Sequence, residues 1–336
     1  MKAIFTEKDF ELCSVPVPKG YPQSQTHAGV ATTGERVYLT TSPFPRIKYG
    51  LLRRAFNKTC RTLTKGLYPP VYGDAQENPL LYWGESGSKC PVEFSPYIGN
   101  PIASTPPQLF GFHSFNSDPD IYIEQRDIFV LNRECFHKSS NKEYWCRINQ
   151  YHFIDQENGA SYVNSKVLLE TPSVFLSPSI AKWKSEYCMF YLETTSYNTG
   201  DKECHLYVRK SEHVDGNYDK IKELRIVSDL FIPWHLSVFE FAGELFSIAS
   251  CIKAGHPKRL YQMLGKFNKE LTTLFIYQQP LIDIPSYRGA AYVDASGNIV
   301  LYSTTDCYRV SGSVSVDGKD VIMMTKSFNE ILREIK

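Results

Sequence analysis

One hairpin unit recurs five times along this chain of 336 residues, and the repeat limits the choice of fold more than any other feature. In residues 231–250 an apolar/polar alternation follows Trp234 and His235, breaks at Gly243 and then resumes, which is typical of two strands joined by a hairpin. We expect the first strand of each unit to begin at an anchor residue, which is Val238 in this unit and Val30, Ile121, Ile180 and Ala291 in the others. The five anchors are 91, 59, 58 and 53 residues apart in chain order. Units of this length with three or four strands each are typical of the blades of a β-propeller.

We therefore predict an all-β fold, a five-bladed β-propeller over residues 1–336 with blades opening near residues 27, 118, 177, 235 and 288. Aromatic third strands are expected at residues 80–83, 144–147, 205–208 and 260–263. The long first interval predicts an insertion at about residues 43–77. Strands from the chain ends are expected to complete the last blade, with residues 314–316 and 321–324 as candidates. A β-sandwich or two separate all-β domains are the alternatives.

A short C-terminal helix is expected over residues 327–335. Ser327 and Glu330 have the spacing of a capping box, in which the two side chains bond to the backbone N–H groups of the first turn.

The composition agrees with a globular β-rich protein. Aromatic residues make up 14% of the chain, and the net charge of +1 gives no overall field that would recruit nucleic acid or an anionic membrane. The first residues are too charged for a secretory signal and no apolar run is long enough to cross a bilayer, so we expect a soluble protein made in the cytosol. Nine Cys residues without a Cys-x-x-Cys pair indicate reduced, mostly buried thiols rather than disulfides or a zinc site.

Polar residues stand at the same offset in all five units. Three residues before the anchors are His27, Asp118, Ser177, His235 and Arg288, with Asp120, Ser179, Ser237, Trp234 and Tyr287 beside them. Inner strands of a propeller crowd around one mouth of its channel, so these side chains are expected to meet there and to grip a small polar ligand.

Each member of this set also has a structural interpretation. The Asp118 Pro119 pair is a common turn opener, and both His27 and His235 could be hydrogen-bonded caps of strand ends. Arg288 could form an ion pair with Asp118 or Asp120, because a buried guanidinium needs a carboxylate. Trp234 and Tyr287 could be packing residues.

The pattern resembles the five-bladed propellers of the furanosidase group of glycoside hydrolases, with family 43 the nearest. The stretch Asp118 Pro119 Asp120 Ile121 is similar to that family's Asp-Pro strand openers, and residues 177–183 are similar to its third-blade strand. Residues 234–238 and 287–288 resemble the openers of the fourth and fifth blades in its relatives. The resemblance extends over residues 20–310 in the spacing of the repeated units. It implies a glycan bound and hydrolysed at the channel mouth.

The chain departs from the family at two of three catalytic positions. In the family an Asp opens the first blade as base, an Asp in the second blade orients and tunes, and a Glu before the Pro of the third blade is the acid. In this chain the three positions hold His27, Asp118 and Leu176. The usual acid is absent, and an imidazole replaces the first carboxylate.

The resemblance therefore implies catalytic roles for Asp118, His27 and His235, since a His can act as base near neutral pH. It implies substrate binding by Asp120, Arg288, Trp234, Tyr287, Ser179 and Ser237. Glu193, Glu124 or Glu240 would substitute for the missing acid only in a different register. The His and Asp side chains at the channel could ligate a metal, but the carboxylate count is low for calcium, and we expect no metal and no cofactor.

A basic stretch from Arg46 to Lys65 carries seven Lys and Arg residues without an acidic residue. Such a patch suits phosphate, an acidic glycan or an acidic protein partner, or is simply a solvated surface. The sequence predicts a carbohydrate-interacting, glycosidase-like propeller whose ligand is a glycan or another small polar molecule. The alternative is a non-catalytic structural or adaptor propeller, for example a virion (tail) component. We expect neither membrane nor nucleic acid as a partner.

Overall fold

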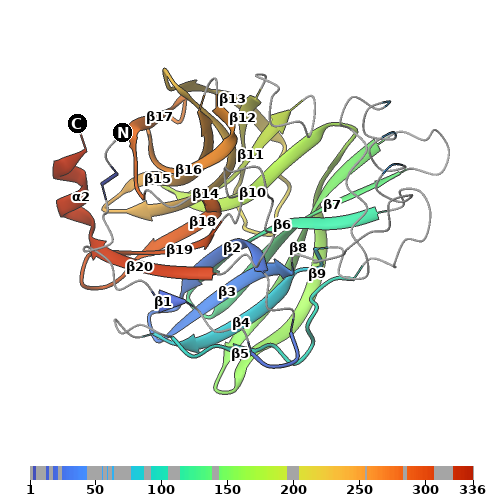
Figure 1. Cartoon of the computed structure of the whole chain (residues 1–336). Helices are drawn as coiled ribbons and strands as arrows, with labels where there is room; N and C mark the ends of the chain where they lie inside the picture. Colours follow the sequence, from blue (N-terminus) through green and yellow to red (C-terminus); the bar gives the residue numbers. More distant parts are fainter. Residues whose placement is uncertain are drawn as a thin grey trace.

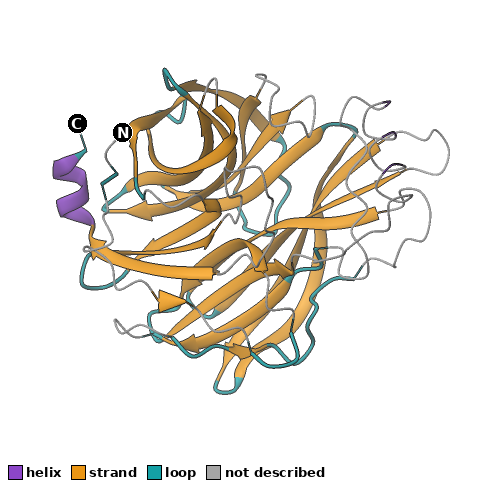
Figure 2. Ribbon diagram, in the orientation of Figure 1, coloured by secondary structure: helices purple, strands orange, loops and turns teal. Residues whose placement is uncertain are grey.

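The computed structural model describes residues 3–4, 13–14, 18–21, 25–43, 55, 59, 63, 77–86, 92–104, 114–137, 144–194, 204–253, 256–282, 286–305 and 321–335. These residues form an all-β body with a short helix at the C-terminal end (Figures 1 and 2). The prediction of an all-β fold is confirmed.

Within the described residues the strands form four sheets. The first sheet contains, in spatial order, β2 (Gln25–Thr32), β3 (Arg36–Pro43), β4 (Leu80–Glu85) and β5 (Ser95–Pro96). The second contains β6 (Ser114–Glu124), β7 (Asp127–His137), β8 (Tyr144–Gln156) and β9 (Gly159–Thr171), again in spatial order. Both sheets are antiparallel meanders.

The third sheet has eight strands. Its order is β10 (Val174–Trp183), β11 (Glu186–Thr194), β12 (Cys204–Ser211), β13 (Lys220–Val227), β17 (Thr273–Pro280), β16 (His256–Phe267), β15 (Glu244–Lys253) and β14 (Phe231–Phe241). Two antiparallel groups of four strands meet where β13 pairs in parallel with β17. This parallel pairing joins the outermost strands of the two groups into one sheet.

The fourth sheet joins the two ends of the chain. Its order is β18 (Ser286–Val293), β19 (Asn298–Thr305), β20 (Val321–Ser327) and β1 (Cys13–Ser14). Cys13 pairs with Met323 and Ser14 with Ile322. The expected closure by terminal strands is confirmed for residues 321–324, whereas residues 314–316 lie outside the described residues.

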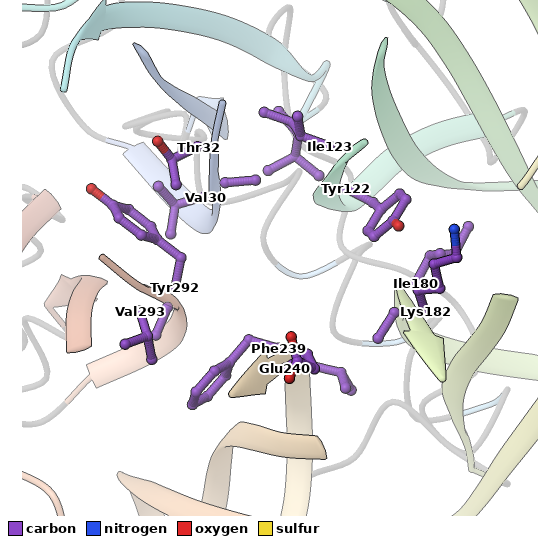
Figure 3. Close-up of a pocket in the computed structure, with 15 residues that line it drawn as sticks. Val30, Thr32, Tyr122, Ile123, Ile180, Lys182, Phe239, Glu240, Tyr292 and Val293 are labelled. Atoms are coloured by element: carbon purple, nitrogen blue, oxygen red, sulfur yellow. The ribbon is translucent and has the colours of Figure 1, made fainter. Parts of the chain in front are cut away.

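The strands β2, β6, β10, β14 and β18 lie around a common centre. Each of them contacts the next in chain order, and β18 contacts β2, so the ring is closed. Figure 3 shows side chains from all five strands around the space that they enclose. This is the arrangement of a propeller, in which inner strands line a central channel. The expected aromatic third strands are confirmed as parts of β4, β8, β12 and β16.

The C-terminal helix α2 (Phe328–Glu334) is confirmed, but the predicted capping box is wrong. Ser327 is the N-cap residue, yet its side chain makes no capping hydrogen bond. The helix is held instead by Phe328, which is fully buried with ring centroids 5.6, 5.1 and 5.0 Å from those of Phe239, Phe241 and Phe246. Aromatic packing therefore fixes the helix on the sheet, because such pairs stabilise beyond their buried area.

The inner strands begin earlier than their anchors, so the expectation that each anchor opens a strand is wrong. For example, β6 starts at Ser114, well before Ile121. The physical reason is a β-bulge or similar irregularity in every inner strand, which interrupts the period-two alternation that sequence patterns detect. The bulges fall at or beside the five polar positions identified above, so those residues lie in mid-strand.

Gly29 allows the first bulge to approach its neighbour closely. A Cβ at this position would lie 2.9 Å from the Asp120 Cα and 2.9 Å from the Thr40 Cγ2. We therefore expect Gly29→Ala to lower the free energy of unfolding by about 1–3 kcal/mol, because backbone atoms must shift. Urea unfolding measures this effect, and a variant as stable as the natural protein would contradict the close approach.

Candidate functional site

Three of the polar positions have a backbone conformation that L residues rarely adopt. His27, Asp118 and Ser177 have φ angles of 56°, 51° and 52°, and each lies within the bulge of its strand. A left-handed residue in a bulge turns its side chain away from the regular pleat. Such conformations cost about 1–3 kcal/mol each and are frequent at functional sites. The repeated strain therefore marks this end of the channel as a candidate site.

Asp118 is the centre of the site. Its Oδ1 lies 3.0 Å from His27 Nε2 and 3.6 Å from His235 Nδ1, and its Oδ2 accepts a hydrogen bond of 3.1 Å from the Ser177 backbone N–H. The Arg133 Nε is 3.4 Å from Oδ2. Ser177 Oγ lies 2.7 Å from His235 Nδ1. Four of the five predicted positions thus meet around one carboxylate.

His27, Asp118 and His235 have the composition of a metal-ligand set. One ligand atom from each residue lies within 4.8 Å of the others, and all three side chains are buried. Two imidazoles and one carboxylate suit zinc and other first-row divalent ions better than calcium, which prefers oxygen ligands. The residues present therefore fit a divalent ion, whereas from the sequence alone we expected no metal.

Glu77 is a site residue that the sequence analysis missed. Its Oε2 accepts a hydrogen bond of 2.5 Å from Ser117 Oγ and lies 3.6 Å from His27 Nδ1. It precedes β4 and so belongs to the segment that we predicted as an insertion, outside the repeat. Ser117 and Arg133 were missed as well. Because Glu77 lies in a loop outside the repeat, no repeated position in the sequence marks it as a site residue among the other Glu residues.

Arg288 and Asp120 form a second layer of the channel. Arg288 Nη1 donates a hydrogen bond of 2.5 Å to the Pro119 carbonyl, and Nη2 lies 3.7 Å from Asp120 Oδ2. Ser237 Oγ donates to the Asp120 carboxylate at 3.3 Å. Ser179 Oγ accepts a hydrogen bond of 2.9 Å from the Val238 N–H. The ion pair considered for Arg288 is therefore present, with Asp120 as its partner.

Tyr287 is the predicted aromatic residue with the most contact to the His pair. Its ring centroid lies 5.1 Å from that of His27 and 4.8 Å from that of His235, and the side chain is half-buried. Trp234 is more deeply buried, with its ring centroid 6.1 Å from that of His235. Tyr287 is therefore the better placed of the two to touch a ligand.

The two aspartates have opposite pKa shifts. Burial alone would raise the pKa of Asp118, but the charges of Arg133, His27, His235 and Arg288 hold it below its ordinary value. Burial raises the pKa of Asp120 above its ordinary value, and Arg288 with the Ser179 and Ser237 hydroxyls opposes this only in part. The surrounding charges thus stabilise the anionic form of Asp118 more than that of Asp120.

The raised pKa of Asp120 gives stability that is present below the unfolded-state pKa and lost as the pH rises through the folded-state pKa. We expect the free energy of unfolding of Asp120→Asn, relative to the natural protein, to increase as the pH rises above about 4, the ordinary pKa of an Asp side chain, by about 1.4 kcal/mol for each unit of the shift. Urea unfolding at several pH values measures this difference. A difference that is flat or falls with pH would contradict the shift.

The carboxylates considered as substitute acids do not join the site. Glu124 pairs with Lys182 at 2.5 Å, and Lys182 and Glu240 line a cavity of about 410 Å³ formed by the other ends of the inner strands (Figure 3). Glu193 lies in β11, opposite Phe175 and His205. Leu176, at the family's acid position, is buried in the hydrophobic core. No second carboxylate at the described residues therefore faces Asp118 across an open subsite.

Other predicted features lie away from this site. The seven basic residues of the stretch from Arg46 to Lys65 lie outside the described residues. Among the described cysteines, Cys135, Cys146, Cys188 and Cys251 are buried thiols outside any disulfide, and Cys204 is a half-buried one, as expected. In the part of the chain that is described, no helix has the length and apolar character needed to cross a membrane.

The structure resembles solved structures of glycan-active proteins. An N-acetylgalactosamine deacetylase from F. plautii, solved with a blood group B trisaccharide, shares 14% identity with a TM-score of 0.68 over 97% of each chain. A thermostable family 43 glycoside hydrolase shares 12% identity with a TM-score of 0.56 over 93% of this chain and 91% of that one. A family 117 glycoside hydrolase from Zobellia galactanivorans shares 10% identity with a TM-score of 0.55 over 95% and 90%.

These likenesses define the class of fold. The chain resembles glycoside hydrolases of families 43, 62 and 117, and the resemblance noted in the sequence is confirmed at the level of structure. No family model and no curated protein matches the sequence.

Proposed function

We propose that the chain is a single five-bladed propeller that binds a glycan at the mouth formed by His27, Asp118, His235 and Arg288. The eight-stranded sheet then counts as two blades, β10–β13 and β14–β17, because each group begins with an inner strand of the closed ring. The solved structures with this fold support a carbohydrate ligand, since their names describe deacetylation and glycoside hydrolysis.

The proposed chemistry is hydrolysis assisted by a divalent ion at His27, Asp118 and His235. The observation that carries it is the convergence of one ligand atom from each residue within 4.8 Å. A bound divalent ion supplies a Lewis acid that polarises a carbonyl and a water molecule without a second carboxylate. Asp118 supplies the negative charge that holds the ion, and Tyr287 supplies an aromatic surface beside it.

Hydrolysis at an acyl group suits this site better than cleavage of a glycosidic bond. Glycosidic cleavage needs two carboxyl groups on opposite sides of the scissile bond. In this site Glu77 is separated from Asp118 by His27, and both carboxylates contact the Ser117 hydroxyl.

In an N-acetyl sugar, water adds to the amide carbonyl carbon, the C–N bond breaks, and the amine takes a proton, which yields acetate and an amino sugar.

The reaction class is tested by analysing products. The protein loaded with Zn²⁺ or Mn²⁺ is incubated with a panel of N-acetylated oligosaccharides and with aryl glycosides. We expect acetate release without new reducing ends, and loss of this release in the presence of a chelator and in His235→Ala. Release of reducing ends or of the aryl group instead would favour the two-carboxylate mechanism and would contradict the proposal.

Tyr287→Ala is expected to weaken glycan binding about tenfold, or about 1.4 kcal/mol, because the ring beside the His pair is lost. Tyr122→Ala, in the cavity at the other end of the inner strands, is the matched control and should leave glycan affinity unchanged. Calorimetric titration with an oligosaccharide that binds the natural protein provides the measurement. A larger loss in Tyr122→Ala would place the glycan at the other end of the channel.

A second candidate function is a non-catalytic structural or adaptor propeller, such as a virion component. The observation that favours it is the burial of the ring: Asp118 and Arg288 are 0% exposed and His27 is 2% exposed. This candidate requires that the protein neither bind nor hydrolyse a glycan, so the product analysis and the calorimetric titration above separate the two functions.

A further inference from the structure

The imidazole of His27 lies between two buried carboxylates. Its Nε2 is 3.0 Å from Asp118 Oδ1, and its Nδ1 is 3.6 Å from Glu77 Oε2. The side chains of His27, Asp118 and Glu77 are 2%, 0% and 6% exposed, so these contacts form in a region that little water reaches. Each ring nitrogen therefore faces its own carboxylate oxygen, and the two sides of the ring are distinct.

The choice between the two neutral tautomers decides whether His27 can bind an ion. A neutral imidazole carries one N–H donor and one lone pair. With the proton on Nδ1, Glu77 Oε2 lies 3.6 Å from the nitrogen that carries it, and the Nε2 lone pair is on the side of Asp118. With the proton on Nε2, the ring donates to Asp118 and has no lone pair for the ion. An ion shared by Nε2 and Asp118 requires Nε2 to be unprotonated, and the carboxylate beside Nδ1 then stabilises the proton on that side of the ring.

Glu77 is held beside His27 by hydrogen bonds that tie it to the second sheet. Ser117 Oγ donates to its Oε2 at 2.5 Å. The adjacent Asn78 accepts a hydrogen bond of 2.8 Å from the Asn116 side chain, which in turn accepts one of 2.7 Å from Asn132. Glu77 has a φ of 52°, so this segment keeps a rare backbone conformation that places the carboxylate at the ring.

We propose that Glu77 is a positioning residue that fixes the orientation and the Nδ1–H tautomer of His27, so that Nε2 presents its lone pair to the ion shared with Asp118 and His235. This role rests on the divalent-ion site of the proposed function. Glu77 acts through His27 and does not itself contact the ion. Metal-binding imidazoles generally donate their other N–H to a carboxylate, carbonyl or water, and loss of such a partner costs about 10- to 100-fold in metal affinity.

The test is a double-mutant cycle on metal affinity. The dissociation constant for Zn²⁺ is measured by competition with a chromogenic chelator for the natural protein, Glu77→Gln, His27→Ala and the double variant. We expect Glu77→Gln to weaken binding about 10- to 100-fold in the natural protein. In the His27→Ala background the same change should have less than about a twofold effect, because the ring through which Glu77 acts is gone. Glu240→Gln at the other end of the channel is the matched control and should change nothing.

A spectroscopic readout distinguishes positioning from a general loss of structure. With Co²⁺ as the probe, Glu77→Gln should shift the visible absorption bands of the bound ion, whereas Glu240→Gln should not. Glu77→Asp, which keeps the charge but shortens the side chain beside His27, provides a milder variant and should weaken Zn²⁺ binding in the same direction if Glu77→Gln does not fold.

The outcomes are distinguishable. If the natural protein binds no Zn²⁺, the proposed function fails and the role of Glu77 fails with it. If the natural protein binds Zn²⁺ and Glu77→Gln binds equally well, only the positioning role is overturned. Equal losses from Glu77→Gln with and without His27 would likewise overturn it, because Glu77 would then act independently of the ring.

Discussion

Asp118→Asn is expected to lose measurable binding of a divalent ion at the channel mouth. Asp118 contributes the carboxylate to the ligand set, and its contacts with both imidazoles place it at the centre of the set. Replacing it with a neutral amide of the same shape should weaken Zn²⁺ binding by more than the roughly 10- to 100-fold that removal of an outer partner costs. Chelator competition measures the change. Asp120→Asn, two residues away and outside the ligand set, is the control and should retain the ion.

The same substitution should also destabilise the fold. Asp118 is fully buried beside Arg133, and removal of one partner of a buried ion pair typically costs about 3–5 kcal/mol. Urea unfolding of metal-free protein separates this effect from the loss of the ion. A protein that keeps both its stability and its Zn²⁺ affinity after this change would contradict the central place that we give to Asp118.

Arg288→Met is expected to produce the other large effect, a loss of about 3–5 kcal/mol in the free energy of unfolding. Arg288 is the largest fully buried side chain among the described residues, and it spans from β18 to β6, where it contacts Pro119 and Asp120. Met fills much of the volume but leaves Asp120 buried without this cation. Asp120→Asn in the same chain should therefore recover part of the loss.

Denaturant unfolding of the two single variants and the double variant measures this coupling. If the double variant is less stable than Arg288→Met alone, the pair does not interact as its 3.7 Å separation indicates. The pair lies in the second layer, beside the ion site. Arg288→Met therefore also tests whether the ion site keeps its geometry when this layer is disturbed.

The part of the site that could be predicted from sequence is the part that repeats. His27, Asp118, Ser177, His235 and Arg288 share one offset from their anchors, and a shared offset in equivalent strands becomes proximity around a closed ring. The bulges at these positions were not predictable in the same way, because an irregularity of this kind breaks the alternation that identifies a strand. The strand starts were therefore placed too late.

Glu77 shows what periodic patterns leave out. It lies between β3 and β4 in the long first interval, which has no counterpart in the other units, and only the folded chain brings it to His27. The capping box failed for a different reason. Ser327 and Glu330 have the right spacing, but the burial of Phe328 among three other Phe rings determines where α2 begins. Tertiary packing overrode the local signal.

We expected no metal from the sequence because we counted the carboxylates in it. The proposed ion site rests instead on distances between side chains in the folded chain. One carboxylate is a poor basis for a calcium site, and the sequence does not show that two imidazoles from β2 and β14 reach the same carboxylate oxygen. The change from an oxygen-based to a nitrogen-based ligand set also moves the proposed chemistry from glycosidic bonds to acyl groups.

The central claim is that this propeller holds a divalent ion at its mouth, and anomalous diffraction from crystals grown with Mn²⁺ or Zn²⁺ tests it most directly. We predict one strong anomalous peak at about 2.0–2.3 Å from His27 Nε2, Asp118 Oδ1 and a ring nitrogen of His235, with Glu77 on the Nδ1 side of the His27 ring. A peak elsewhere, or none while His27 donates directly to Asp118, would contradict the account.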